Sequence, residues 1–203
     1  MVWLLHWGGR RRLIEALMRH AGIGRQRLID IRDRALLLIG FAGAFRRSEL
    51  VGLDVRDIEE TAEGLRVSIR RSKGDQEGLG AIVAIPRGSV ACPVQAFHDW
   101  VRAADITGGP VFRPITKGQQ LQATRLTDRG LVKIIKRHAS RVGLEPSEFA
   151  GHSLRAGFLT SAAARGANIF RMADQSRHRS LEVLRRYVRS ADLFKAHPGS
   201  GLL

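Results

Sequence analysis

Apolar residues recur at helical spacing along most of the chain. The longest such segment, 30–43, is nearly all apolar after Arg34, and its length predicts a buried helix rather than a strand. Ser48 is then expected to cap a short helix that runs through Gly52. Later helices are predicted to begin at Pro93 and after the capping residue Thr127, and to span 153–164, 169–175 and 180–188.

Three short runs have the alternating pattern of strands instead. They are 55–60, 65–71 and 81–86, and a polar, glycine-rich turn at 73–80 joins the last two. This arrangement predicts a small three-stranded antiparallel sheet inserted in a helical chain. The expected fold class is therefore mainly α with one such sheet, an α+β architecture.

The length of 203 residues suits one domain, or at most a domain with a small appendage. Segment 1–29 is expected to be a short N-terminal segment with a packing helix that stops at 22–24, and 30–203 to form the main domain with a C-terminal tail. Leu193 and Phe194 in the tail are candidates for docking on a neighbouring protomer or on their own domain.

Charge and cysteine content narrow the function. Lys and Arg number 34 against 19 Asp and Glu, a formal charge of +15, which points to a polyanionic partner. The single cysteine, Cys92, excludes an intramolecular disulfide and a multi-cysteine zinc site. The apolar run 35–45 is shorter than the ~20 residues that span a bilayer, and the apolar start precedes its arginines, unlike a secretory signal. We expect a cytoplasmic protein that binds nucleic acid, with no membrane partner.

Several residues could act on a phosphodiester. Arg46 directly follows the buried helix and adjoins a helix start, where a guanidinium fork suits a phosphate, and Glu49 could hold it in place. A plain ion pair at a helix end is the alternative. His152 and Arg155, three apart, share a helix face, which is easiest to explain if an anion lies between them.

Three more candidates come from other parts of the chain. Lys73 ends a strand at the glycine-rich turn, and His178 precedes Tyr187, the one tyrosine, by nine residues. A solvated lysine and a tyrosine at the edge of the core are the alternatives. No Asp, Glu, His or Cys cluster has the spacing of a metal site, so neither a metal nor a cofactor is expected.

Taken together, these side chains supply cations, proton donors and an oxygen nucleophile. Free tyrosine has a pKa near ~10, so only about 0.1% is phenolate at pH 7, a cost of roughly 4 kcal/mol. Two arginines and a lysine around a phosphate could offset that cost.

These motifs, in this order and spacing, resemble the catalytic domain of a tyrosine recombinase of the phage integrase and Xer-type group. The resemblance covers about 30–187. It rests on Arg46-Arg47-Ser48-Glu49-Leu50, Ser72-Lys73, Gly151-His152-Ser153-Leu154-Arg155, His178-Arg179-Ser180 and Tyr187.

The resemblance implies a role for each residue. Arg46 and Arg155 would clamp the scissile phosphate, and His152 and His178 would hydrogen-bond its oxygens and help move protons. Tyr187 would attack the phosphorus to form a 3′-phosphotyrosyl link.

The same resemblance implies that Lys73 would protonate the leaving 5′ oxygen and that Glu49 would support the site. Because the phosphotyrosyl link conserves the energy of the phosphodiester bond, rejoining would need no ATP. The implied site also uses no metal. Site-specific recombination or integration of double-stranded DNA, normally within a tetramer of protomers, is the implied function.

Two departures from the family pattern stand out. Arg177 occupies the place where many members have glycine before the second histidine, so a displaced His178 or an added DNA contact is expected. Segment 1–29 is too short for the usual N-terminal DNA-binding domain. A non-catalytic DNA-binding remnant that occupies sites or modulates a full-length partner is therefore the alternative function. A metal-dependent nuclease lacks the necessary carboxylate cluster.

Overall fold

The computed structural model describes residues 27–70, 80–89 and 91–191. The predicted N-terminal packing helix, Lys73 and the tail residues Leu193 and Phe194 lie outside these residues. In chain order the elements are α2 (Leu28–Ala42), α3 (Arg47–Gly52), the 3-10 turn η1 (Val55–Asp57), β1 (Ile58–Glu60), β2 (Gly64–Ile69), β3 (Ala81–Pro86), α4 (Pro93–Ala103), α5 (Asp128–Arg141), the 3-10 turn η2 (Pro146–Glu148), α6 (Ser153–Ala164), α7 (Ile169–Ser176) and α8 (Leu181–Ala191). The predicted fold class, mainly helical with one small sheet, is confirmed.

Helix α2 is the centre of the large core. Its residues from Ala35 to Gly40 are all buried, as its nearly continuous apolar sequence predicts. The chain leaves this helix through a tight turn, in which Ala44 takes a left-handed conformation with φ 46°. The turn brings Arg46 to the start of α3.

The start of α3 differs from the prediction. The helix begins at Arg47 with Arg46 as its N-cap, so the assignment of Ser48 as the cap is wrong. The Glu49 carboxylate accepts the Arg46 backbone N–H at 2.8 Å, which satisfies the helix terminus from inside the first turn. The first predicted strand is also shorter than expected. An Asp57 carboxylate oxygen accepts the Asp54 N–H at 2.9 Å and closes the 3-10 turn η1 ahead of β1.

The sheet is antiparallel throughout, with strand order β1-β2-β3. Leu65, Val67 and Ile69 of β2 face the core, and the intervening residues are exposed, which confirms the predicted alternation. Leu65 lies opposite Ile85 and Val67 opposite Val83, so β3 contributes to the same apolar face.

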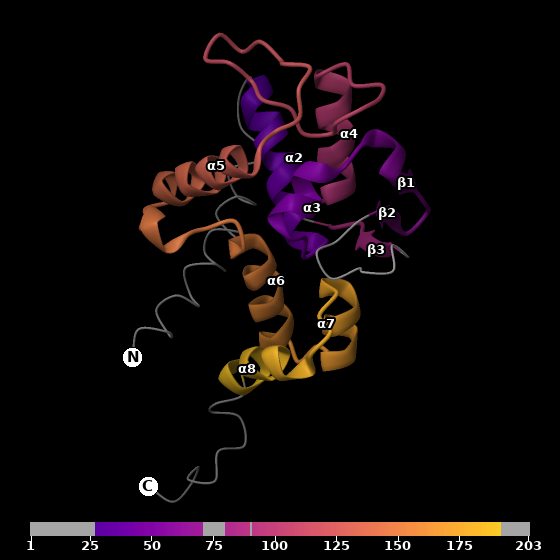
Figure 1. The fold of residues 1–203 in the computed structure, drawn as a ribbon, viewed down its shortest axis with the longest axis vertical. Coiled ribbons are helices and arrows are strands. Elements are labelled where there is room, and N and C mark those ends of the chain that lie inside the picture. The colour runs from indigo at the N-terminus through magenta and orange to yellow at the C-terminus, as the bar shows by residue number, and fades with distance from the viewer. Residues whose placement is uncertain (1–26, 71–79, 90, 192–203) are drawn as a thin grey trace, which may run out of the picture.

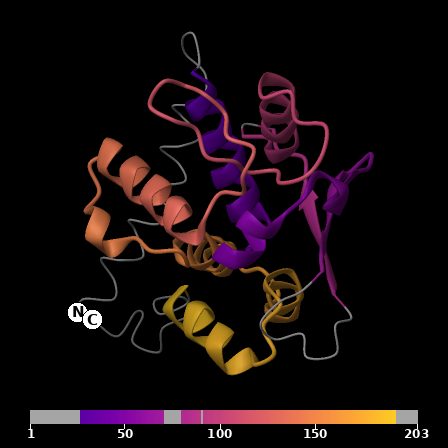
Figure 2. The same ribbon diagram turned by 45° about the horizontal axis from the view of Figure 1, so that its top comes forward.

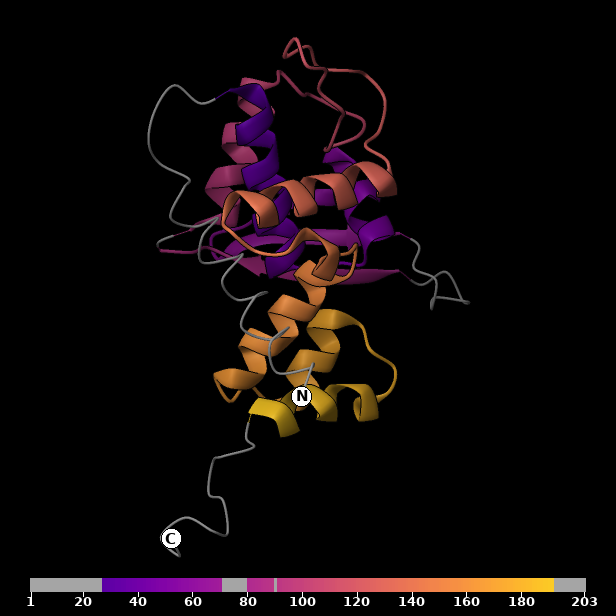
Figure 3. The same cartoon turned by 90° about the vertical axis from the view of Figure 1, so that its left-hand side faces the viewer.

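The helices form two layers. In the upper layer, α2 packs against α4, and α2 and α3 lie between α5 on one side and the sheet on the other (Figures 1 and 2). In the lower layer, α8 packs against α6 and α7, around a separate small core that includes Leu159, Met172 and Leu184 (Figure 3). Helix α6 contacts α2 and connects the layers.

A buried carboxylate fastens α5 to α2. Asp33 is fully buried and forms ion pairs with Arg32, Arg137 and His138, the last at 2.8 Å. Burial by itself would raise the pKa of Asp33, but the hydrogen bond from His138 and the charges of the arginines outweigh it and hold the pKa below its usual value. Asp33 is therefore ionised and compensated in the interior.

Candidate functional site

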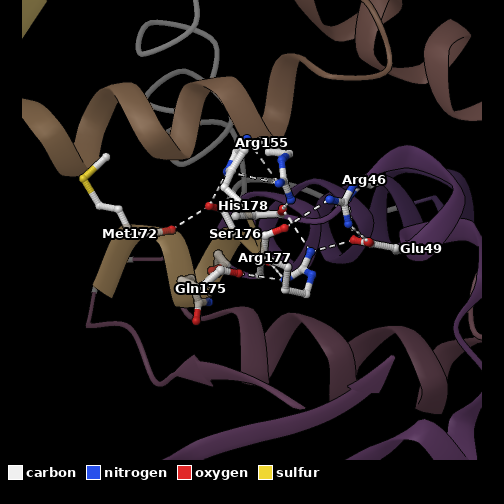
Figure 4. Close-up of polar contacts among 11 residues, drawn as sticks. Arg46, Glu49, Arg155, Met172, Gln175, Ser176, Arg177 and His178 are labelled. Atoms are coloured by element: carbon white, nitrogen blue, oxygen red, sulfur yellow. Dashed lines mark hydrogen bonds and ion pairs between the residues drawn. The ribbon is translucent and has the colours of Figure 1, made fainter. Parts of the chain in front are cut away.

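The site lies where the two layers meet. Its first part is the pair formed by Arg46 and Glu49 at the start of α3. The Arg46 guanidinium donates to Glu49 at 2.6 Å and to the Arg177 carbonyl at 3.1 Å (Figure 4). These two bonds use only part of the five N–H donors of a guanidinium, and the Arg46 side chain is 26% exposed. Arg46 therefore retains donors for a further acceptor.

Arg177 is the second guanidinium on Glu49. It follows α7 in a left-handed conformation with φ 55°, a backbone geometry that favours glycine. Its side chain points inward, is 10% exposed, and donates to Glu49 at 2.6 Å (Figure 4). It also donates to the carbonyls of Gly43 and Gln175 and lies over the Phe45 ring, 5.3 Å from the centroid.

Arg177 thus ties the end of α7 to the turn before α3. The donors that form these bonds are directed into the protein, and the expected DNA contact of Arg177 stays a prediction. Gln175 makes a parallel connection, donating to the Ala42 carbonyl at 2.8 Å and to the Ala84 carbonyl at 2.9 Å.

Arg155 comes from α6 and is almost fully buried. Its guanidinium donates to the Ala44 carbonyl at 2.8 Å, and its Nη2 lies 3.2 Å from His178 Nδ1. Burial, followed by the charges of Arg46 and Arg177, lowers the pKa of Arg155 to about 10. The guanidinium is still charged at neutral pH, but an anion beside it would relieve this repulsion.

His178 is held from two sides. Ser176 Oγ lies 2.7 Å from its Nδ1 and donates to the Met172 carbonyl at 2.5 Å (Figure 4). Burial, followed by the charges of Arg155, Arg46 and Arg177, lowers the pKa of His178 to about 4. The imidazole is therefore neutral at pH 7.

The net charge of this cluster is positive. The cluster holds the three guanidinium groups of Arg46, Arg155 and Arg177 and one carboxylate, which pairs with Arg46 and Arg177, and His178 adds no charge. Burial would raise the pKa of Glu49, but Arg177 and Arg46 outweigh it and keep the pKa below its usual value. With Glu49 ionised, the net charge is about +2, and an anion such as a phosphodiester suits this surplus.

The other predicted residues lie at different distances from the cluster. Tyr187 lies on α8, packs against the small core, and is close enough to Arg155 to oppose the lowering of its pKa. His152 is the exposed N-cap of α6, and its imidazole forms no hydrogen bond with the described residues. The structure thus brings together Arg46, Glu49, Arg155 and His178, places Tyr187 nearby, and leaves His152 at the rim.

Two residues of this cluster were not among the candidates drawn from the sequence. Ser176 had no signal in the sequence, since a serine near a helix end is commonplace. Arg177 was marked only by its replacement of a glycine. In the described part of the chain, no group of three or more His, Cys, Asp or Glu side chains could hold a metal ion. None of the described helices combines the length and apolar character needed to cross a membrane.

Comparison with known proteins gives a consistent result. The model of the phage integrase family matches residues 11–193. An integrase/recombinase xerD homolog of Selenomonas ruminantium is 43% identical over 172 residues, which cover 84% of this chain and 50% of the relative. A tyrosine recombinase XerC of Pelotomaculum thermopropionicum is 32% identical over 145 residues, covering 70% of this chain and 44% of that one.

Solved structures agree on the fold. The XerH site-specific recombinase bound to palindromic difH substrate, a post-cleavage complex, superposes with a TM-score of 0.69 at 18% identity, over 96% of this chain and 51% of XerH. The XerA recombinase superposes with a TM-score of 0.66 at 19% identity, over 94% of this chain and 61% of XerA. The chain spans about half the length of the curated relatives it matches.

Proposed function

Because the chain belongs to the phage integrase family, whose model matches most of its length, we propose that it is a tyrosine-type site-specific DNA recombinase. It would break and rejoin double-stranded DNA in the cytoplasm through a 3′-phosphotyrosyl intermediate. The proposed catalytic residues are Arg46, Lys73, His152, Arg155, His178 and Tyr187, with Glu49 as support.

The convergence of Arg46 and Arg155 on one positively charged spot carries this proposal. Arg46 reaches it from the start of α3 and Arg155 from α6, and each retains donors beyond its internal bonds. A phosphodiester there would be held by charge-assisted hydrogen bonds. The same donors stabilise the charge that builds on the non-bridging oxygens as the phosphorus becomes five-coordinate.

The proposed covalent step uses Tyr187 as the nucleophile and Lys73 as the acid. The Tyr187 oxygen forms a bond to phosphorus and passes its proton to one of the two proposed histidines, while the bond from phosphorus to the 5′ oxygen breaks. Lys73 protonates that leaving oxygen. In the reverse direction a 5′ hydroxyl of the partner duplex attacks the phosphotyrosyl link, so rejoining needs no external energy source. Two duplexes cut on both strands require four tyrosines, so a tetramer on DNA is part of the proposal.

Covalent trapping tests the proposed function. The full chain is incubated with nicked duplex DNA from the region flanking its gene, so that a short fragment diffuses away after cleavage. EDTA is present throughout. We expect a denaturant-resistant protein–DNA adduct with the wild type and none with Tyr187→Phe, which removes only the nucleophilic oxygen.

DNA binding measured in parallel makes a negative result informative. Each phosphate contact should contribute about −0.9 to the slope of log affinity against log salt, and Tyr187→Phe should leave this slope unchanged. Salt-sensitive binding without any adduct would contradict catalysis by this chain and would favour a DNA-binding role. An adduct that persists in Tyr187→Phe would contradict the assignment of the nucleophile.

A further inference from the structure

We propose that Arg177 is a positioning residue for strand cleavage, because it fixes the two arginines that would clamp the scissile phosphate, Arg46 and Arg155, relative to each other before DNA binds. The role in cleavage rests on the proposed function, whereas the fixed geometry is a property of the free protein. Arg177 follows α7 in the lower layer, and its side chain reaches the turn between α2 and α3 and the first turn of α3 in the upper layer.

The donors of Arg177 are directed into the protein. Nη1 donates to the carbonyls of Gln175 at 2.7 Å and Gly43 at 3.2 Å. Nη2 donates to Glu49 at 2.6 Å and to the Ala44 carbonyl at 3.2 Å. These bonds account for the terminal N–H groups of a guanidinium, and the remaining donor, Nε, is buried without a hydrogen-bond partner among the described residues. In this proposal Arg177 acts through the groups it holds, and not by contacting a DNA phosphate.

Residue 177 holds Arg46 in two ways. One Glu49 carboxylate oxygen accepts from the Arg46 side chain at 2.6 Å, and the other accepts both the Arg46 backbone N–H at 2.8 Å and Nη2 of Arg177. Arg177 thereby fixes the carboxylate that orients Arg46. In addition, the backbone carbonyl of Arg177 accepts from Arg46 Nη2 at 3.1 Å. Both terminal nitrogens of Arg46 are therefore held, and each keeps a second N–H for a phosphate oxygen.

Arg155 shares an acceptor with Arg177. The Ala44 carbonyl accepts from Arg155 Nη1 at 2.8 Å and from Arg177 Nη2 at 3.2 Å. Ala44 has a left-handed conformation with φ 46°, a sparsely populated geometry that persists only when the surrounding structure supports it. Arg177 supplies part of that support by bonding to this carbonyl and to the preceding one, that of Gly43. One side chain thus contacts the groups that hold both phosphate-clamping arginines.

Packing keeps the Arg177 side chain in this position. Its guanidinium lies over the Phe45 ring, 5.3 Å from the centroid, and the ring is buried. The Phe45 ring in turn occupies the space beside Gly43, where a Cβ atom would lie 2.2 Å from it. Arg177, Phe45 and Gly43 therefore form one packed unit, which does not have to become ordered when DNA arrives.

A fixed pair of arginines favours cleavage over simple binding. Arg46 and Arg155 carry like charges and repel each other, so side chains free to move would separate, and a phosphate would have to bring them together. When the protein holds them, their donors already face the charge that builds on the non-bridging oxygens. DNA affinity comes from many phosphates along the duplex, whereas the rate depends on the geometry at one. Loss of Arg177 should therefore lower the rate more than the affinity.

Single-turnover cleavage of the nicked duplex separates rate from affinity. Adduct formation by the full chain is measured against DNA concentration for the wild type, Arg177→Lys and Arg177→Met. Lysine keeps the charge, but its three donors cannot serve all the acceptors, and methionine keeps the contact with the Phe45 ring without any donor. We expect the maximal rate to fall roughly tenfold to a hundredfold in Arg177→Met and less in Arg177→Lys. The DNA concentration at half-maximal rate should change less than about twofold.

A matched control separates positioning from a general loss of stability. Asp33→Asn breaks the buried ion pairs between α2 and α5, outside the site, and should destabilise the chain by a comparable amount. Measured well below the Tm of each variant, Asp33→Asn should keep the wild-type maximal rate. The slope of log affinity against log salt for the Arg177 variants should equal that of the wild type, because loss of one phosphate contact would reduce its magnitude by about 0.9.

Nuclear magnetic resonance of the free protein tests the fixed geometry without DNA. In a chain labelled with 15N-arginine, rotation about the Cζ–Nε bond of Arg46 exchanges its two terminal nitrogens, and Arg46→Lys identifies their signals. Holding both nitrogens slows this rotation, so we expect two resolved Nη signals in the wild type. In Arg177→Met the Glu49 carboxylate loses the partner that fixes it, and the two signals should broaden or merge.

The two proposals fail in different ways. Arg46 signals that are merged in the wild type, or equally resolved in Arg177→Met, overturn the fixed geometry. An unchanged maximal rate in Arg177→Met, or an equal fall in Asp33→Asn, overturns the role in cleavage while the recombinase function stands. Weaker binding with a smaller salt slope in Arg177→Met overturns it in favour of a direct DNA contact. If the wild type forms no adduct, the proposed function and the cleavage role fail together, and the spectra still decide the geometry.

Discussion

Replacing Arg177 with glycine measures what the buried arginine contributes. Two effects oppose each other. Glycine relieves the left-handed conformation at φ 55°, a gain of about 1 kcal/mol. The substitution also removes the ion pair with Glu49, whose side chain is 1% exposed, and breaking a buried pair costs about 3–5 kcal/mol. We therefore expect a net loss of stability.

The magnitude lies at the lower end of this range because Glu49 keeps a second partner. Arg46 still donates to it at 2.6 Å, so the carboxylate is not left uncompensated. The expected loss is about 2–3 kcal/mol in the free energy of unfolding, measured by urea denaturation. For a chain of this size, that corresponds to a fall in Tm of about 4–12 °C.

A double-mutant cycle attributes the effect to the ion pair. Arg177→Met, Glu49→Gln and the double variant give the coupling energy between the two side chains, which should exceed about 1 kcal/mol. Arg177→Met keeps the packing on the Phe45 ring and removes the charge. An Arg177→Gly protein as stable as the wild type, or a coupling energy near zero, would refute the reasoning.

Two further outcomes follow from groups described above. Asp33→Asn should lower the free energy of unfolding by about 3 kcal/mol, because it leaves buried Arg32 without its counter-charge. The partly exposed Asp30→Asn should cost less than about 1 kcal/mol in the same urea assay. Discounted for solvent screening of a half-buried group, the lowered pKa of His178 should reduce the free energy of unfolding by about 2 kcal/mol as the pH falls from 6.5 to about 4, because the unfolded chain protonates His178 before the folded one does. His178→Gln should lack this part of the pH dependence. A variant that follows the wild-type curve would show that the histidine stays protonatable in the fold.

Periodicity was sufficient to predict the regular elements. The bounds of β3 and α6 coincide with the prediction, because alternation in one case and an unbroken helical segment in the other leave one interpretation. Ser48 and the strand start at Val55 were assigned wrongly for a common reason. In each case a carboxylate three residues into the turn, Glu49 or Asp57, accepts the backbone N–H that opens the turn. Sequence pattern alone does not show which of two candidate groups makes that bond.

The polar contacts of the site were beyond sequence reasoning. Glu49 and Arg177 are far apart in the chain, and their pairing depends on how the two layers dock. The sequence suggested that Glu49 could hold a guanidinium but gave no indication that it holds two. Ser176 contacts His178 only because the chain turns back after α7 and brings the imidazole to its hydroxyl.

The shared carboxylate also restricts the order in which substitutions can accumulate. With glycine at position 177, Glu49 would pair with Arg46 alone. When arginine occupies that position, loss of Glu49 leaves a buried guanidinium without its counter-charge. A single substitution of Glu49 is then strongly destabilising. A change from glycine to arginine at position 177 is compatible with Glu49, whereas replacing Glu49 when Arg177 is present would be destabilising. The arginine at position 177 therefore makes Glu49 a residue that the folded protein requires.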